Sequence, residues 1–171
     1  SNEKIISVVG RLSEEKGHKF LFQSLAKLKN NHPHLKWKLN IVGDGPLKED
    51  LNLLAAKLNL LSNINFQGFV NNMDAVYINS DLIVLPSENE AFPFVAIEAL
   101  AYEKPVISTN VGGLPEIIKH NETGLLVPYG DENAMADSIL RVLDDEEFAT
   151  RIANNGKDFF LKNLTFDKML N

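Results

Sequence analysis

Short apolar runs of strand length alternate with stretches of helical periodicity along most of this chain. The first run, IISVVG at residues 5–10, is β-branched and ends in glycine, and the stretch after it places Leu21, Leu25 and Leu28 on one helical face. Further strands are predicted at residues 36–42, 63–69, 81–87, 105–110 and 124–129. Helices are predicted at residues 18–31, 47–58, 72–79 and from Pro93 onward, followed by two closing helices that carry Met135, Ile139, Val142 and Leu143, and Phe148, Ile152, Phe159 and Phe160.

This alternation predicts the fold class. Parallel strands need crossover connections, and helices provide them, so the pattern indicates a doubly wound, Rossmann-like α/β domain with a six-stranded parallel sheet and helices on both faces. We expect residues 1–171 to form one domain. Ligands of such sheets bind outside the carboxyl ends of the strands. The stretches that follow four of the strands, at residues 10–17, 43–46, 68–70 and 86–94, are therefore candidate binding segments.

The overall charge and residue usage narrow the function further. Seventeen basic and 23 acidic residues give a net charge of −6, which argues against broad binding of nucleic acid or anionic membranes. The chain has no cysteine, which suits a reducing, cytoplasmic location, and its four histidines are not clustered as metal ligands would be. No apolar run reaches the roughly 20 residues that span a bilayer. The chain starts within a few residues of a strand, consistent with its being part of a longer protein.

The stretch GRLSEEKG, residues 10–17, carries two cations at the end of the first strand. Arg11 and Lys16, with backbone N–H groups before a helix start, could hold an anion such as a diphosphate. The alternative is a solvated turn in which these cations pair with Glu14 and Glu15. Neither GxGxxG nor a Walker lysine motif is present, so ordinary dinucleotide and P-loop sites lose their main support.

The turn Gly43-Asp44-Gly45-Pro46 follows the second strand and leads into a helix predicted to start near Pro46. Its glycines could let the backbone approach a ligand closely. Glycine and proline also occur in such turns for backbone reasons alone, so both interpretations stay open.

Two carboxylates flank the apolar run after the fourth strand. From Ala91 to Tyr102 the only charged side chain is Glu98, and a helix that is apolar on nearly every side is usually buried, where a carboxylate needs a partner. Because Pro93 favours a helix start, Glu90 should lie in the loop and Glu98 inside the helix. A carboxylate can accept hydrogen bonds from both hydroxyls of a ribose. The alternative for Glu98 is a surface glutamate beside Tyr102.

Six motifs in order carry a family resemblance. GRLSEEKG, VGDGP, FQGFV, PSENEAFPFVAIEALAYEKPVIST, VGGLPEII and TGLLV run from about Ile5 to Val127 and resemble the C-terminal, donor-binding half of a GT-B glycosyltransferase of family four, glycosyl transferases group 1. The resemblance implies the strand order 3-2-1-4-5-6 and a retaining enzyme that uses a nucleoside diphosphate sugar, most plausibly a UDP-sugar. It also implies that no metal or other cofactor is held tightly.

The resemblance also implies residue roles. It puts Arg11 and Lys16 on the donor diphosphate, where they would stabilise the leaving group, and Glu90 on the transferred sugar, so that these three are the implied catalytic residues. Glu98 would accept from the ribose, and the backbone at Val70 would read the base. The other implied donor-binding residues are Gly10, Gly43, Phe92, Pro93, Phe94 and Val95. Ala91 and Pro93 replace two glycines that the family most often has, which shifts the expected sugar contacts.

The resemblance covers only half of an enzyme. A GT-B protein holds its substrates between two domains, and the N-terminal, acceptor-binding domain is absent from this chain. We therefore expect this domain to bind donor without turnover, with membrane association, if any, belonging to the full-length protein. The alternatives are a sugar-nucleotide epimerase of related shape and a non-catalytic α/β interaction module.

Overall fold

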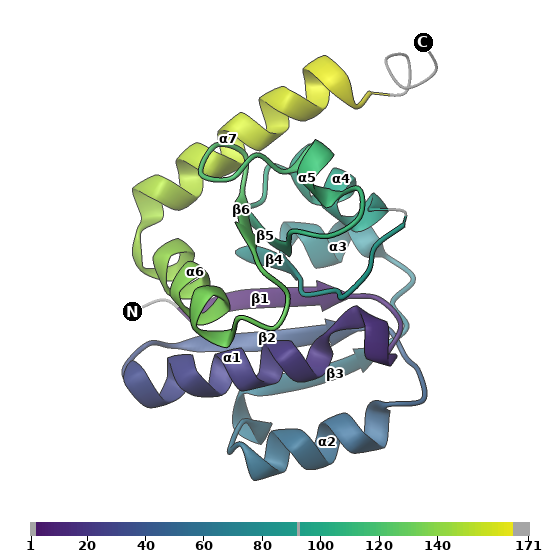
Figure 1. The fold of residues 1–171 in the computed structure, drawn as a ribbon, viewed down its shortest axis with the longest axis vertical. Helices are drawn as coiled ribbons and strands as arrows, with labels where there is room; N and C mark the ends of the chain where they lie inside the picture. Colours follow the sequence, from purple (N-terminus) through teal and green to yellow (C-terminus); the bar gives the residue numbers. More distant parts are fainter. Residues whose placement is uncertain (1–2, 92, 166–171) are drawn as a thin grey trace.

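The computed structural model describes residues 3–91 and 93–165, and its centre is one parallel sheet (Figure 1). The strands are β1 (Lys4–Val9), β2 (Trp37–Val42), β3 (Ile64–Gly68), β4 (Leu82–Leu85), β5 (Val106–Thr109) and β6 (Leu125–Val127). They lie in the order β3-β2-β1-β4-β5-β6, and every neighbouring pair is parallel. This confirms the predicted fold class and strand order. The order reverses beside β1, so β1 and β4 flank the crevice where such sheets bind ligands.

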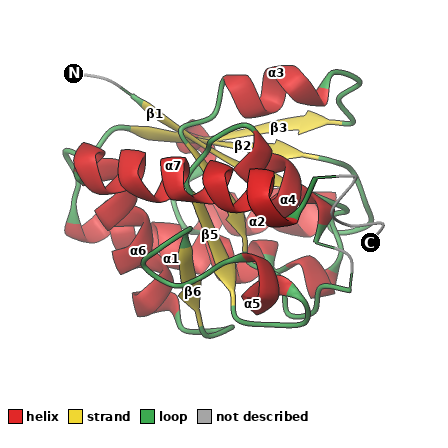
Figure 2. Cartoon of the chain, turned by 90° about the horizontal axis from the view of Figure 1, so that it is seen from above, coloured by secondary structure: helices red, strands yellow, loops and turns green. Residues whose placement is uncertain are grey.

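Helices cover both faces of the sheet (Figure 2). One apolar cluster joins the sheet to α1 (His18–Asn31), α2 (Lys48–Lys57) and α6 (Glu132–Asp144). A second cluster joins the other face to α3 (Met73–Ile78), α4 (Phe94–Ala101) and α5 (Leu114–Ile117). The closing helix α7 (Glu146–Asn163) packs Phe148 and Ile152 into the first cluster and Phe159 and Phe160 against the second. It therefore crosses from one layer to the other.

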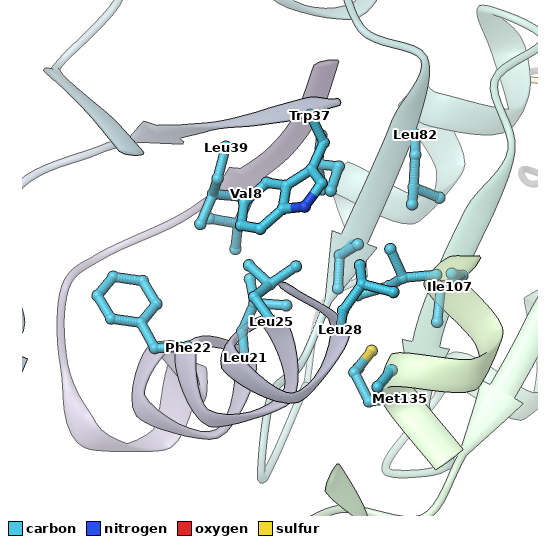
Figure 3. Packing of buried hydrophobic residues seen from close by; sticks show 14 of the residues in the cluster. Val8, Leu21, Phe22, Leu25, Leu28, Trp37, Leu39, Leu82, Ile107 and Met135 are labelled. Atoms are coloured by element: carbon cyan, nitrogen blue, oxygen red, sulfur yellow. The ribbon is translucent and has the colours of Figure 1, made fainter. Parts of the chain in front are cut away.

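The larger core lies between α1 and the sheet (Figure 3). Leu21 and Leu25 are fully buried on α1, as their spacing predicts, and Trp37 at the start of β2 is 2% exposed. The stretch HKFLFQSLAKLKNN buries Phe22 as well, so the apolar face of α1 is wide. This packing fixes α1 on the sheet, and with it the loop between β1 and α1.

One predicted boundary differs from the structure, and one short helix was not predicted. The second helix begins at Lys48, with Leu47 at its N-cap, rather than near Pro46, because residues 43–46 belong to a turn in which the Leu47 N–H donates to the Leu12 carbonyl. The one-turn helix α5 was not predicted, since four residues are too few for a periodic signal. The fourth helix begins at Phe94 directly after Pro93, close to the predicted start.

Candidate functional site

A cavity of about 350 Å³ lies at the carboxyl ends of β1 and β4. One wall comes from the β1 end and the loop that follows it, and the opposite wall from residues 85–87, Glu90 and the start of α4. The sequence-predicted residues that line it are Gly10, Arg11, Lys16, Glu90, Pro93, Phe94 and Val95. The structure thus brings together the two cations and the loop carboxylate, which lie more than 70 residues apart in the chain.

A second cavity of about 290 Å³ lies along the ends of β1, β2 and β3, whose arrowheads point the same way in Figure 1. It shares Gly10 and Arg11 with the first cavity and adds Gly43 and Val70, two further predicted site residues. Phe69, a residue that is 82% exposed, also lines it. The two cavities therefore lie side by side along the carboxyl edge of the sheet, and Gly10 and Arg11 line both of them.

Close backbone contacts hold the two cavity walls together. A Cβ atom on Gly17, whose φ is +78°, would lie 1.9 Å from the Pro86 carbonyl oxygen, so only glycine fits there. The Glu88 N–H donates to the Glu15 carbonyl at 2.8 Å. On the far side, the Thr109 hydroxyl donates to the Ser87 carbonyl at 2.6 Å. The loop after β4 is thus tied to both of its neighbours.

Lys16 and Glu90 form an ion pair across the cavity. The Lys16 Nζ lies 3.3 Å from Glu90 Oε2, which also accepts a hydrogen bond from Ser87 Oγ at 3.2 Å. The alternative of a turn that pairs its own charges does not describe Lys16, because Glu14 pairs with Lys19 and Glu15 accepts from Ser13 instead. The hydrogen bond from Ser13 is the main reason that the pKa of Glu15 is lowered.

Arg11 is left available at the cavity edge. Its side chain is exposed, and it forms no hydrogen bond or salt bridge with residues 3–91 or 93–165. Its place between the two cavities allows it to meet an anion lying across both.

Glu98 is not buried, which corrects an expectation from its apolar surroundings. The apolar helix α4 buries Ala96, Ala99 and Leu100 against the sheet and α7, but Glu98 faces solvent and lines neither cavity. An apolar helix is buried on all sides only where other elements pack against every side. One side of α4, the side that carries Glu98, is left open to solvent. Burial and then the nearby Glu98 carboxylate raise the pKa of Tyr77 on α3. Phe92, another predicted site residue, lies outside the described residues.

His18 is a cavity residue that sequence reasoning missed. It is the first residue of α1, and it lines the cavity behind Lys16. The four histidines are not clustered in sequence, so a metal-site pattern does not single it out, and its place beside an ion pair at a helix start is visible only in the fold. Ser87 was missed for a similar reason, since a lone serine carries no signal in sequence.

The described part of the chain contains no group of three or more histidine or acidic side chains placed to hold a metal ion. It also contains no helix with both the length and the apolar character needed to cross a membrane.

Comparisons with known proteins identify the family. Residues 1–159 match the family described as Glycosyl transferases group 1. The chain belongs to this family. It is 36% identical over 170 residues to an uncharacterized glycosyltransferase of Methanocaldococcus jannaschii, covering 98% of this chain and 43% of the relative. It is 31% identical over 169 residues to the N-acetyl-alpha-D-glucosaminyl L-malate synthase of Bacillus anthracis, covering 99% of this chain and 44% of that relative.

Solved structures match the fold as well. A glycosyltransferase from Rickettsia africae has a TM-score of 0.90 at 31% identity, covering 99% of this chain and 46% of that one. The C-terminal domain of a group 1 family protein from Francisella tularensis has a TM-score of 0.86 at 26% identity, covering 95% of this chain and 87% of that one. The Anabaena protein HepE in complex with UDP-glucose has a TM-score of 0.86 at 26% identity, covering 94% and 44%. This glycosyl transferase domain thus has the fold of GT-B C-terminal domains. It spans less than half the length of the Methanocaldococcus and Bacillus relatives.

Proposed function

We propose that this domain binds the nucleoside diphosphate sugar of a retaining glycosyltransferase, most plausibly a UDP-sugar. The observation that carries the proposal is the convergence of Arg11, Lys16 and Glu90 in one cavity at the carboxyl ends of β1 and β4, beside a second cavity that Val70 lines. A nucleotide sugar has the matching order of parts: sugar, diphosphate, ribose and base.

The assignment of the parts follows from charge. The diphosphate belongs beside Lys16 and Arg11, where two cations meet the strand ends. The sugar belongs beside Glu90, whose carboxylate can accept from its hydroxyls. The base belongs in the second cavity beside the backbone at Val70, and the ribose lies between base and diphosphate. The motif resemblance implies that Glu98 accepts from the ribose hydroxyls.

The chemistry of such a site is electrostatic. When the bond between sugar and diphosphate breaks, negative charge grows on the leaving diphosphate, and cations already in place stabilise it without reorganisation. Glu90 reduces the net positive charge of the cavity and is placed to orient the transferred sugar. Turnover also needs an acceptor molecule. We assign the binding of this acceptor to an N-terminal domain of the full-length protein, outside this chain.

The relatives named above are a glycosyltransferase and an N-acetyl-alpha-D-glucosaminyl L-malate synthase, and they do not favour the alternatives of an epimerase or an interaction module. The Anabaena structure with UDP-glucose supports a UDP-sugar as donor. The retaining mechanism rests on the motif resemblance, and the cytoplasmic location, with peripheral membrane association of the full-length protein, stays a prediction.

Calorimetric titration of this chain with UDP, GDP and ADP tests the proposal. We expect saturable binding of one nucleotide, weakened about tenfold or more by Lys16→Ala because a charged hydrogen bond is lost. Glu98→Ala should also weaken it if the carboxylate meets the ribose. Lys57→Ala is the matched control, since it removes the same charge from an exposed position at the end of α2, which leads back to the opposite edge of the sheet.

Absence of binding by all three nucleotides would contradict the proposal for this domain. Equal loss in Lys57→Ala and Lys16→Ala would mean that only the net charge matters. In the full-length protein, incubation with UDP-sugar and no acceptor separates transferase from epimerase, because only an epimerase would convert the sugar.

A further inference from the structure

His18 is a buried polar side chain that has no partner among residues 3–91 and 93–165. It is 1% exposed, and neither Nδ1 nor Nε2 forms a hydrogen bond with any of these residues. Most buried polar groups in proteins are hydrogen-bonded, because burial removes their hydrogen bonds to water and an unpaired group forms no new bond to offset that loss of free energy. An apolar side chain at this position would fill the space without leaving a buried polar group unpaired. The two unpaired nitrogens therefore indicate a role in binding.

The surroundings of His18 indicate which function. Its side chain lines the cavity that holds Lys16 and Arg11. It is the first residue of α1, a helix of 14 residues whose N-cap is Gly17 and whose first N–H groups donate to no capping side chain. The N-terminus of a helix favours negative charge, and so do the two neighbouring cations. Among the described residues, Glu90 is the one carboxylate in the cavity lining, and it already pairs with Lys16, so the helix end and the two cations favour an anion over a neutral group.

The ring is neutral in the free domain. Burial, and then the Lys16 cation, lower the pKa of His18 to about 4. A neutral imidazole keeps one N–H donor, so it can donate to an oxygen without placing a third full positive charge in the cavity.

We propose that His18 is a donor-binding residue that donates a hydrogen bond from its ring to a phosphate oxygen of the bound nucleoside diphosphate. This inference rests on the proposed function and deepens it. The unpaired ring destabilises the free domain. When the diphosphate binds, the ring N–H gains a hydrogen-bond acceptor. The phosphate is chosen over a sugar hydroxyl because the helix end and both cations act on charge.

The variant that tests this is His18→Leu, measured in two ways. Thermal unfolding of the ligand-free chain should leave Tm unchanged or raise it, because an apolar side chain replaces an unpaired polar one. Titration with UDP should give about a tenfold weaker affinity or more, because a hydrogen bond to a charged group is lost. A residue with a purely structural role would instead lower Tm and leave the affinity of the folded fraction unchanged.

Two further variants make the test specific. His18→Gln keeps an N–H donor and should recover much of the affinity for UDP. His34→Leu is the matched control, since His34 is exposed beyond the other end of α1, and it should change neither quantity. In addition, UDP should shift the imidazole ¹⁵N resonances of His18 and leave those of His34 in place.

The outcomes separate this inference from the proposed function. If the wild-type chain binds UDP and His18→Leu binds it equally well, the His18 proposal is overturned while the donor site stands. If His18→Leu weakens UDP-glucose but not UDP, the partner is a sugar hydroxyl and the assignment to phosphate is overturned. Equal weakening of both ligands supports the phosphate. If the wild type binds GDP or ADP instead, the same comparison is made with that nucleotide.

Discussion

The Lys16 ammonium lies 3.3 Å from the Glu90 carboxylate and joins the loop after β1 to the loop after β4. Both side chains are mostly buried, at 28% and 12% exposed. In the free domain, the cation that should meet the diphosphate is thus held by a carboxylate of the same cavity. Donor binding has to share or replace this ion pair, and Glu90 opposes the diphosphate by its like charge.

Glu90→Gln should therefore tighten the binding of UDP by about threefold to tenfold, because it removes that repulsion and frees Lys16. The amide keeps the shape of the side chain and can still contact Ser87. Calorimetric titration of wild type and variant with UDP measures the change. Weaker binding in Glu90→Gln would mean that the carboxylate is needed to hold Lys16 in its binding position, against this prediction.

Arg11→Ala and Lys16→Ala in the full-length enzyme should each lower turnover by roughly 10²-fold or more, as expected when a preorganised electrostatic contact to a developing charge is removed. Steady-state kinetics with the natural donor and acceptor measure the effect, and Lys57→Ala serves as the control of equal charge. An unchanged kcat in either cavity variant would remove that cation from the proposed role.

Much of the fold could be predicted because burial on both sides of the sheet leaves a clear signal. β1 and β4 are short apolar runs bounded by glycine or proline, and the Leu21, Leu25 and Leu28 spacing defines the inner face of α1. The strand order and most of the candidate site came from the motif resemblance and not from periodicity. Local patterns alone do not specify which strand lies next to which.

The parts that could not be predicted depend on contacts between distant segments. The exposure of Glu98 is set by what α4 packs against, which its own apolar sequence does not reveal. The pairing of Lys16 with Glu90 joins two loops that only the sheet brings together. His18 looked like an isolated histidine, and only its burial without partners distinguishes it.

His18 should make the domain less stable as the pH falls below neutral. Its pKa is about 4 in the folded domain against an ordinary 6.5. Between these values the unfolded chain binds a proton that the folded chain does not, so the free energy of unfolding falls as the pH drops from 6.5 toward 4. From about pH 7 to about pH 4.5, wild type should lose about 2 kcal/mol more than His18→Leu, measured by urea unfolding. Parallel losses in the two proteins would contradict the lowered pKa.

Gly17→Ala should destabilise the domain by about 3 kcal/mol or more, because a left-handed backbone costs a non-glycine residue about 1–2 kcal/mol and the added Cβ also meets the Pro86 carbonyl. The matched control is Gly130→Ala, since Gly130 has a similar φ of +86° with nothing within 4 Å of the added atom. It should cost only the backbone share, about 1 kcal/mol. Urea unfolding of both variants separates the two contributions. Equal losses would mean that the loop at Pro86 yields easily, and the cavity walls would then be less firmly joined than their contacts indicate.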